Sequence, residues 1–248
     1  MRKCVLSKCM RSARSTIAAL SACAVLAGCS STPVDGAPVV RITQAAKPSV
    51  TGPLNQVLPT GDELTTTLGA GPGFTGQLVS GGADMLLQSV GESDATPVDC
   101  VSTGYRLQKV VYAAGPVREV ASQSWAGGDF NGPPVSGFFG VVKFAGAADA
   151  QAFFARAADK WRRCNGQTLV LHQPEHGADG VSRITDVVVD STVISAVVLH
   201  DDGSTIQRAF GVASDCVVDI EITDAARSDG ARVAVDVAKL MLQKIGAS

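Results

Sequence analysis

Histidine, aromatic side chains and long apolar runs are all scarce in this 248-residue chain. It has three His residues, and Phe, Trp and Tyr together make up 5% of the sequence. No apolar stretch has the roughly 20 residues that a membrane-spanning helix needs. The G-x-S-x-G and S-x-x-K motifs of serine hydrolases are also missing. These absences argue against a chain with a spanning helix and against several common hydrolase classes.

The N-terminus has the pattern of a bacterial export signal. Five Lys and Arg residues lie within residues 1–14, and the apolar segment 15–28 carries no charge. The sequence L-A-G-C at residues 26–29 resembles the lipobox of bacterial lipoproteins. This resemblance implies cleavage before Cys29 and lipidation of its thiol. An ordinary signal peptide with a chance Cys at this place is the alternative.

Removal of residues 1–28 would leave an acidic protein. Five of the 21 Lys and Arg residues lie in this segment and none of the 23 Asp and Glu residues, so the mature chain has 16 basic residues and a formal charge of −7. Such a charge disfavours nucleic acid and direct adhesion to anionic lipid. Two or more acyl chains would hold the protein stably. We therefore expect it on the outer face of the cytoplasmic membrane, anchored by lipid, with no nucleic-acid partner.

The mature chain divides into a tether and one domain. Segment 29–53 begins with Cys29 and contains four prolines without a helical or strand period, which is typical of a flexible linker. A strand at Ala37–Ile42 is the alternative there. Residues 54–248 are long enough for one domain with a sizeable core.

Strands dominate the predicted domain, together with two amphipathic helices. The turn sequence at His200–Ser204 contains Asp-Gly, which favours a tight antiparallel hairpin. Helical periodicity predicts a helix over residues 147–163 and another at the C-terminus, and shorter helices are predicted at 61–69 and 82–90. The predicted fold class is α+β, a central antiparallel β-sheet with amphipathic helices packed on it. The predicted strands are Tyr105–Ala113, Val117–Trp125, Gly137–Phe144, Thr168–His172, Ile184–Asp190, Thr192–His200, Thr205–Val212 and Cys216–Thr223.

His172, Glu175 and His176 match the H-x-x-E-H order of one class of zinc peptidases. That motif requires a regular helix, but Pro174 lies between the two histidines and disfavours one. A catalytic zinc would also need a third protein ligand. We expect a strand that runs into a turn here, with no metal and no cofactor.

Gly71, Gly73 and Gly76 match the G-x-G-x-x-G pattern of dinucleotide-binding sites. The pattern binds a nucleotide when a strand precedes it and a helix follows it. A predicted short helix precedes it here and no helix is predicted directly after it. We interpret the match as chance in a glycine-rich loop.

The segment 125–134 is glycine-rich yet carries Trp125 and Phe130. Aromatic side chains in such a loop can line a ligand pocket. Both are therefore weak candidates for ligand binding, and packing against the core is the alternative.

Seven cysteines leave three for the folded domain. Cys4, Cys9 and Cys23 lie in the export signal, and Cys29 is the expected lipidation site. An exported domain is in an oxidising compartment, so a disulfide is expected among the remaining three. From the residues alone, any of three pairings is possible, with one thiol left over. The three are Cys100, Cys164 and Cys216.

A family resemblance follows from the cysteine and aromatic spacing. The sequence P-V-D-C at residues 97–100, a helix with Phe153 and Phe154 that ends in W-x-x-C at Trp161–Cys164, and a last strand with Cys216 resemble the PknH-like extracellular sensor domain. That domain forms the outer part of a mycobacterial receptor kinase and also occurs in stand-alone mycobacterial lipoproteins. The resemblance covers residues 54–248.

The resemblance implies an α+β fold, a cleft for a small ligand and no catalytic residues. It also implies a disulfide between Cys100 and Cys164, which closes a loop of 64 residues and is worth about 4 kcal/mol in the chain-entropy model. The family has a second bridge, but here no cysteine lies between Cys164 and Cys216. We therefore expect Cys216 to be a buried free thiol.

These expectations favour a non-enzymatic lipoprotein that binds or senses an unknown small ligand, with no kinase on this chain. A carrier or accessory protein for an envelope lipid or glycolipid is the second hypothesis. An enzyme with dispersed carboxylates is the third, and it would require perturbed carboxylates in a cleft.

Overall fold

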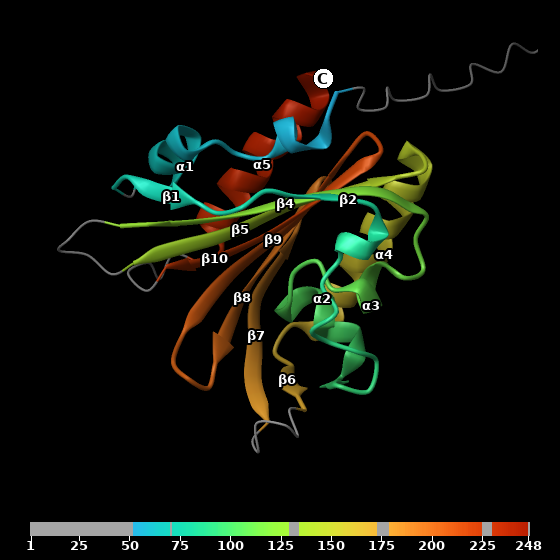
Figure 1. The fold of residues 1–248 in the computed structure, drawn as a ribbon. Coiled ribbons are helices and arrows are strands. Elements are labelled where there is room, and N and C mark those ends of the chain that lie inside the picture. Colours follow the sequence, from blue (N-terminus) through green and yellow to red (C-terminus); the bar gives the residue numbers. More distant parts are fainter. Residues whose placement is uncertain (1–51, 70, 129–133, 173–178, 225–229, 248) are drawn as a thin grey trace, which may run out of the picture. The chain divides into compact units, whose positions relative to one another are not determined.

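The computed structural model describes residues 52–69, 71–128, 134–172, 179–224 and 230–247. Within these ranges the chain forms one antiparallel sheet in the order β1-β4-β5-β10-β9-β8-β7-β6-β3, and β2 pairs with β4 (Figure 1). The predicted α+β class with a central antiparallel sheet is therefore confirmed. The strands are β1 (Gly73–Thr75), β2 (Val79–Gly81), β3 (Ala95–Thr96), β4 (Val117–Gly127), β5 (Val135–Phe144), β6 (Thr168–Leu171), β7 (Gly180–Val189), β8 (Val193–His200), β9 (Thr205–Ala213) and β10 (Cys216–Asp224).

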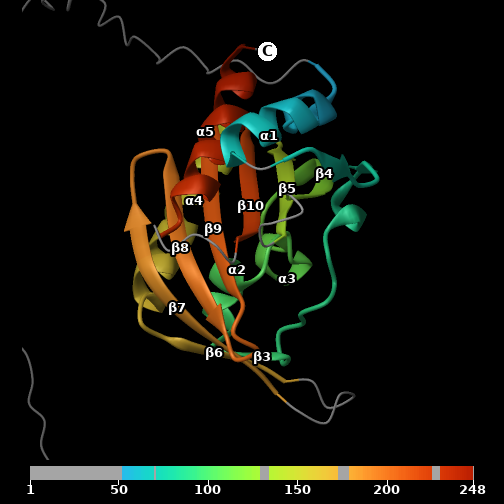
Figure 2. The ribbon, with the colours of Figure 1, turned by 90° about the vertical axis from the view of Figure 1, so that its left-hand side faces the viewer.

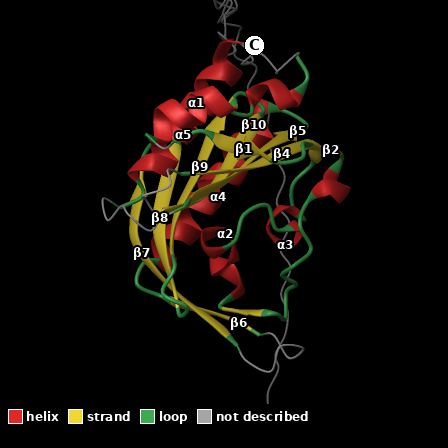
Figure 3. Ribbon diagram, turned by 60° about the vertical axis from the view of Figure 1, so that its left-hand side comes forward, coloured by secondary structure: helices red, strands yellow, loops and turns green. Residues whose placement is uncertain are grey.

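Helices cover both faces of the sheet (Figures 2 and 3). On one face α5 lies across β8, β9 and β10, together with α1 and the 3₁₀ turn η1. On the other face α4 packs against the sheet, with α2 and α3 beside it. The helices are α1 (Gly61–Leu68), α2 (Val101–Gly104), α3 (Lys109–Tyr112), α4 (Ala147–Cys164) and α5 (Arg232–Ala247), and the 3₁₀ turns are η1 (Leu54–Val57), η2 (Ala83–Met85) and η3 (Val98–Cys100).

The central strands β9 and β10 are buried on both faces. Phe210 and Val217 belong to the core below α4, whereas their neighbours Ala209 and Val218 belong to the core below α5. Successive side chains of a strand point to opposite faces, so both cores draw on the same two strands. A slip of one residue would exchange the two sets, and the register is fixed for that reason.

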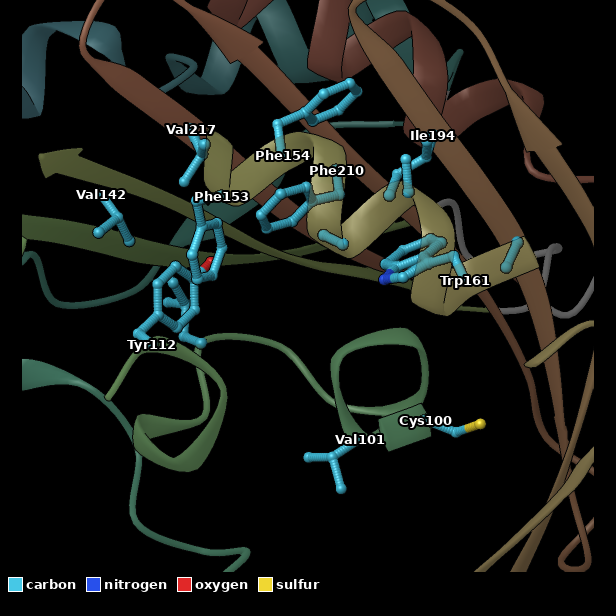
Figure 4. Close-up of a cluster of buried hydrophobic side chains, with 14 of the residues drawn as sticks. Cys100, Val101, Tyr112, Val142, Phe153, Phe154, Trp161, Ile194, Phe210 and Val217 are labelled. Carbon is cyan, nitrogen blue, oxygen red and sulfur yellow. The ribbon is translucent and has the colours of Figure 1, made fainter. Parts of the chain in front are cut away.

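The predicted long helices and the β8–β9 hairpin are present. The hairpin turns through Gly203, whose φ of +85° suits glycine. On α4, Phe153, Phe154 and Trp161 surround Phe210, with ring centroids 6.0 to 6.2 Å from that ring (Figure 4). These aromatic contacts attach α4 to the middle of the sheet. No helix within the described ranges is both long and apolar enough to cross a membrane.

The strand predicted over Tyr105–Ala113 is wrong. This segment holds a bend at Tyr105, a turn at residues 106–107, an isolated bridge residue at Gln108 and the short helix α3. Its β-branched and aromatic residues suggested a strand, but among the described residues its β-pairing is limited to one isolated bridge, between Gln108 and Leu87. Side chains of the sheet bond to the backbone instead, since the Leu107 N–H donates to the Asp219 carboxylate at 2.8 Å. Tertiary polar contacts thus override the local strand preference.

The helix predicted over residues 82–90 is reduced to the single turn η2. The chain leaves the helical conformation at Leu86, whose ψ is 143°. Leu87 then bonds to the segment before α3, because its N–H donates to the Leu107 carbonyl at 2.9 Å and its carbonyl accepts from the Lys109 N–H at 2.7 Å. These two bonds replace those that a longer helix would have made.

Candidate functional site

A cavity of about 620 Å³ lies between α4 and the segment from η3 to α3. This volume falls in the roughly 300 to 1,000 Å³ range of small-molecule sites. Its polar lining consists of the Ser102 hydroxyl and four charged side chains. Its apolar lining consists of Val98, Val110, Val111, Ala114, Phe153 and Ala157.

The apolar side of the cavity is held by an aromatic stack. Phe153 of α4 stacks on Tyr112 of α3 with ring centroids 5.0 Å apart and an interplanar angle of 16° (Figure 4). Phe153 is 6% exposed and Tyr112 is 1% exposed. The two walls therefore meet in a packed contact beside the open space, which gives the cavity a fixed apolar surface.

Charged side chains surround the apolar lining. The Lys160 Nζ lies 2.7 Å from the Asp99 Oδ1 and links the two walls, with both side chains partly exposed. The hydrogen bond from Lys160 lowers the pKa of Asp99 below its ordinary value. Arg156, one helical turn before Lys160, and Glu92 complete the charged lining. Neither of these two forms an ion pair with another described residue.

A disulfide fastens the two walls at one end. Cys100 at the end of η3 and Cys164 at the end of α4 are bonded, with their Cα atoms 5.6 Å apart. This is the pairing that the family resemblance implies. Beside it the Trp161 indole N–H donates to the Ser102 hydroxyl at 3.1 Å. Covalent and polar contacts therefore set the spacing between α4 and α2.

Arg208 of β9 supports the α2 wall from the sheet. Its guanidinium is completely buried and donates to the carbonyls of Ser102 at 3.2 Å and Thr103 at 3.1 Å. It also donates to the Ile220 carbonyl at 3.0 Å and to the Asp219 carboxylate at 2.8 Å. A buried charge is tolerated when it is paired and hydrogen-bonded in this way.

Asp219 of β10 joins this support to the α3 wall. One carboxylate oxygen faces Arg208, and the other accepts from the Leu107 N–H at 2.8 Å and the Tyr112 hydroxyl at 3.0 Å. Burial, with the negative charge of Asp219 nearby, raises the pKa of Tyr112 well above its ordinary value, so this hydroxyl stays a donor. The irregular wall between α2 and α3 is therefore held by polar groups of the sheet. Glu221 extends the cluster by accepting from Arg106 at 2.6 Å.

Trp125 belongs to the core and does not line this cavity. It lies near the end of β4, is 1% exposed and packs in the core below α5. Gly73 and Gly127 lie against its ring, and a Cβ at either position would come within 2.3 Å of an indole carbon. The G-x-G-x-x-G match therefore has a packing explanation at Gly73. Phe130, the other candidate, lies outside the described residues.

The H-x-x-E-H segment is described only at its first residue. The His172 ring lies at the end of β6, with Nε2 3.0 Å from the Thr96 hydroxyl and Nδ1 3.3 Å from the Asp179 carboxylate. The predicted strand before it is present as β6. Glu175 and His176 lie outside the described residues, as does Cys29, so the expectations for them remain predictions.

Cys216 is a free, buried thiol in β10. Burial raises its pKa far above the ordinary value, and the neighbouring Asp215 carboxylate adds to the shift. Since the thiolate is the reactive form, we expect iodoacetamide at mildly alkaline pH to leave Cys216 unmodified in the folded protein and to modify it after unfolding in urea. Mass spectrometry of the peptide that contains Cys216 measures this. Rapid alkylation without urea would show that this strand opens readily.

Most cavity residues could not be singled out from the sequence. The α4 stripe predicted from Ala150, Phe154, Ala157 and Trp161 contains one lining residue. Arg156 and Lys160 carried a signal in their four-residue spacing, which places two cations on one side of the helix. On the opposite wall, Val110 and Val111 lie in the segment that was predicted as a strand, so the prediction did not place them beside α4.

The fold and the site define a class of protein. It is an α+β domain with one antiparallel sheet, helices on both faces, and a cavity beneath a long helix that a disulfide ties to the opposite wall. These features are those of a domain with a cavity of ligand size next to a covalent cross-link.

Comparison with known proteins identifies the family. A family model described as the PknH-like extracellular domain matches residues 50–244. The chain is 30% identical over 110 residues to the serine/threonine-protein kinase PknJ of Mycobacterium bovis and of Mycobacterium tuberculosis. The matched region covers 42% of this chain and 18% of each kinase. The chain belongs to the PknH-like extracellular domain family, and its domain is therefore extracytoplasmic.

A solved structure agrees with this assignment at the level of the fold. The crystal structure of the extracellular domain of PknH from Mycobacterium tuberculosis matches with a TM-score of 0.66 and 21% sequence identity. The match covers 77% of this chain and 94% of that chain. The family model thus confirms the resemblance seen in the sequence, and this structure confirms the fold.

Proposed function

We propose that this protein is a membrane-anchored lipoprotein whose extracytoplasmic domain binds a small ligand without catalysis. The observation that carries the proposal is the cavity of about 620 Å³ between α4 and the η3–α3 wall. Its walls are joined by the disulfide Cys100–Cys164 and by the Phe153–Tyr112 stack. A preformed chamber with a mainly apolar lining and a few polar groups is the usual form of a ligand site.

The electrostatics of the cavity support binding over catalysis. A general acid that works near neutral pH needs a carboxyl whose pKa is raised. The pKa of Asp99 is shifted downward by its bond to Lys160, which is the opposite direction. Away from the cavity, the Ser182 hydroxyl lies 2.8 Å from the His200 Nδ1. Ser182 is 1% exposed, so a substrate would not reach this pair.

The proposed anchor is a lipid on Cys29. We expect the wild-type chain to sediment with membranes and to incorporate a palmitate analogue, because acyl chains bury enough methylene groups to hold it. The Cys29→Ser variant should lose the label. Cys23→Ser, which changes another cysteine of the same leader, should keep it. Equal labelling of the two variants would contradict lipidation at Cys29.

A carrier of envelope lipid or glycolipid is the second candidate function. The six apolar side chains of the lining favour it, since they would suit an acyl chain. The two functions differ in what accompanies the purified protein. A carrier should retain a lipid through gentle purification, whereas a sensor of a soluble ligand should be recovered empty and bind its ligand when supplied.

Native mass spectrometry of a cavity-filling variant tests both functions. Ala114 lines the cavity and is exposed, so Ala114→Trp should occupy its mouth without disturbing the core. We expect a ligand retained or bound by the wild-type chain to be lost at least tenfold in this variant, because the indole fills the space that the ligand needs. Ala113→Trp is the matched control, since Ala113 is exposed and does not line the cavity. Equal ligand retention by both variants would contradict the cavity as the binding site.

A further inference from the structure

We infer that the cavity takes an amphipathic anion, with its apolar chain along Phe153 and Ala157 and its carboxylate or phosphate at Arg156 and Lys160. This inference rests on the proposed ligand-binding function and adds the chemical class of the ligand. Four residues of one helix carry it, since Phe153, Arg156, Ala157 and Lys160 all line the cavity.

The spacing of these residues places charge beside an apolar surface. Residues three and four apart on a helix are neighbours on its surface. Arg156 therefore lies next to Phe153, and Lys160 next to Ala157 and Arg156. Phe153 and Ala157 are each 6% exposed, whereas Arg156 is exposed. An elongated ligand along this helix would meet apolar side chains at its body and cations at its head.

Arg156 is the primary head-group residue. It has no ion-pair partner among the described residues, so its guanidinium is available to a ligand. The planar fork of Arg matches the paired oxygens of a carboxylate or a phosphate. It stands on α4, which the disulfide and the core hold in place, and a fixed position reduces the entropy lost on binding.

Lys160 is the second cation, and Asp99 is its present partner. The Lys160–Asp99 pair spans the two walls at 2.7 Å, with side chains 43% and 58% exposed. Exposed pairs of this kind are weak and exchange readily. An anionic head group bound at Arg156 would lie close enough to compete with Asp99 for Lys160. Asp99 is therefore a residue that limits affinity for anions in the unoccupied site.

A cationic ligand fits the lining less well. The acidic lining residues are Glu92 and Asp99. They lie in different segments, and Asp99 already has Lys160 as its partner. Glu92 is an exposed carboxylate in a turn, and Asp99, the other acidic residue of the lining, lies in η3. The two cations, in contrast, are neighbours on one rigid helix.

Titration with amphiphiles that share one apolar chain tests the inference. The full-length Cys29→Ser chain is titrated calorimetrically, below their micelle concentrations, with dodecanoate, dodecyl phosphate, dodecyl glucoside and dodecyltrimethylammonium. We expect both anions to bind at least fivefold more tightly than the sugar head, and the cation to bind most weakly. Added salt should weaken the anions and leave the glucoside unchanged. Dodecanoate tighter than dodecyl phosphate would indicate a fatty acid, and the reverse order a phospholipid.

Substitutions at the charged lining residues test the role that each one is given. Arg156→Gln should weaken both anions about fivefold while dodecyl glucoside stays within about twofold. Asp99→Asn should strengthen the anions, because Lys160 is then released. Lys239 is an exposed cation of α5, on the other face of the sheet. Lys239→Gln should therefore leave the affinity for all four amphiphiles unchanged.

The outcomes separate this inference from the proposed function. Equal affinity for anions and glucoside, or anion binding that Arg156→Gln leaves unchanged, would overturn the anionic class while the cavity remains a binding site. If Ala114→Trp bound all four amphiphiles as tightly as the protein without this substitution, the cavity would not be their binding site. Loss of anion affinity in Asp99→Asn would overturn the role given to Lys160.

Discussion

Asp219→Ala should lower the free energy of unfolding by about 3 to 5 kcal/mol, the usual effect of removing one partner of a buried ion pair. The loss arises because Arg208, completely buried, keeps its charge without its closest carboxylate. The Leu107 N–H and the Tyr112 hydroxyl lose their acceptor at the same time. Urea unfolding followed by circular dichroism measures the change. Because the cavity wall opposite α4 depends on these bonds, ligand affinity should fall as well.

Two further variants identify the cause of that loss. Asp236→Ala removes an exposed carboxylate of α5 and should stay within about 0.5 kcal/mol of wild type. The double variant Arg208→Met/Asp219→Leu removes both charges of this ion pair and should be less destabilised than Asp219→Ala. If Asp219→Ala behaved like Asp236→Ala, the buried charge cluster would not be what holds the wall.

Loss of the disulfide should cost about 4 kcal/mol, since it closes a loop of 64 residues in the unfolded chain. The suitable variant is Cys100→Ala/Cys164→Ala, because both sulfur atoms are buried and serine would add an unpaired hydroxyl. Urea unfolding of this variant gives its free energy of unfolding. Wild-type protein under reducing conditions should show a similar loss.

Cys216→Ala is the matched control for the reductant. Cys216 makes no disulfide, so this variant should remain as sensitive to reduction as the wild type. A stability of wild-type protein that is independent of reductant would contradict the cross-link. If Cys216→Ala were no longer sensitive to reductant, the disulfide would involve Cys216, which would contradict the Cys100–Cys164 pairing.

Regular elements with one clear period were predictable from the sequence. Apolar residues at steps of three and four predicted helix α4. The Asp-Gly turn predicted the β8–β9 hairpin. The cysteine and Trp spacing indicated the family, which the comparisons confirm. These features depend on local chemistry, so a single sequence reveals them.

The cavity was hidden because it depends on contacts distant in sequence. The wall at residues 105–113 looks like a strand from its side chains, but the Leu107 N–H is held by Asp219, which lies 112 residues further along the chain. Trp125 looked like a pocket residue because glycines follow it, although one of these, Gly127, makes room for its ring together with Gly73. Such pairings cannot be deduced from local pattern.

Photo-crosslinking of a bound ligand tests the central claim most directly. A dodecyl amphiphile with a diazirine on its chain is irradiated with the protein, and the modified peptides are identified by mass spectrometry. The account predicts modification within residues 98–114 and 153–160, the two walls of the cavity, and its loss in Ala114→Trp. Modification instead at the exposed apolar residues outside the cavity, such as Phe74 or Val188, would contradict it.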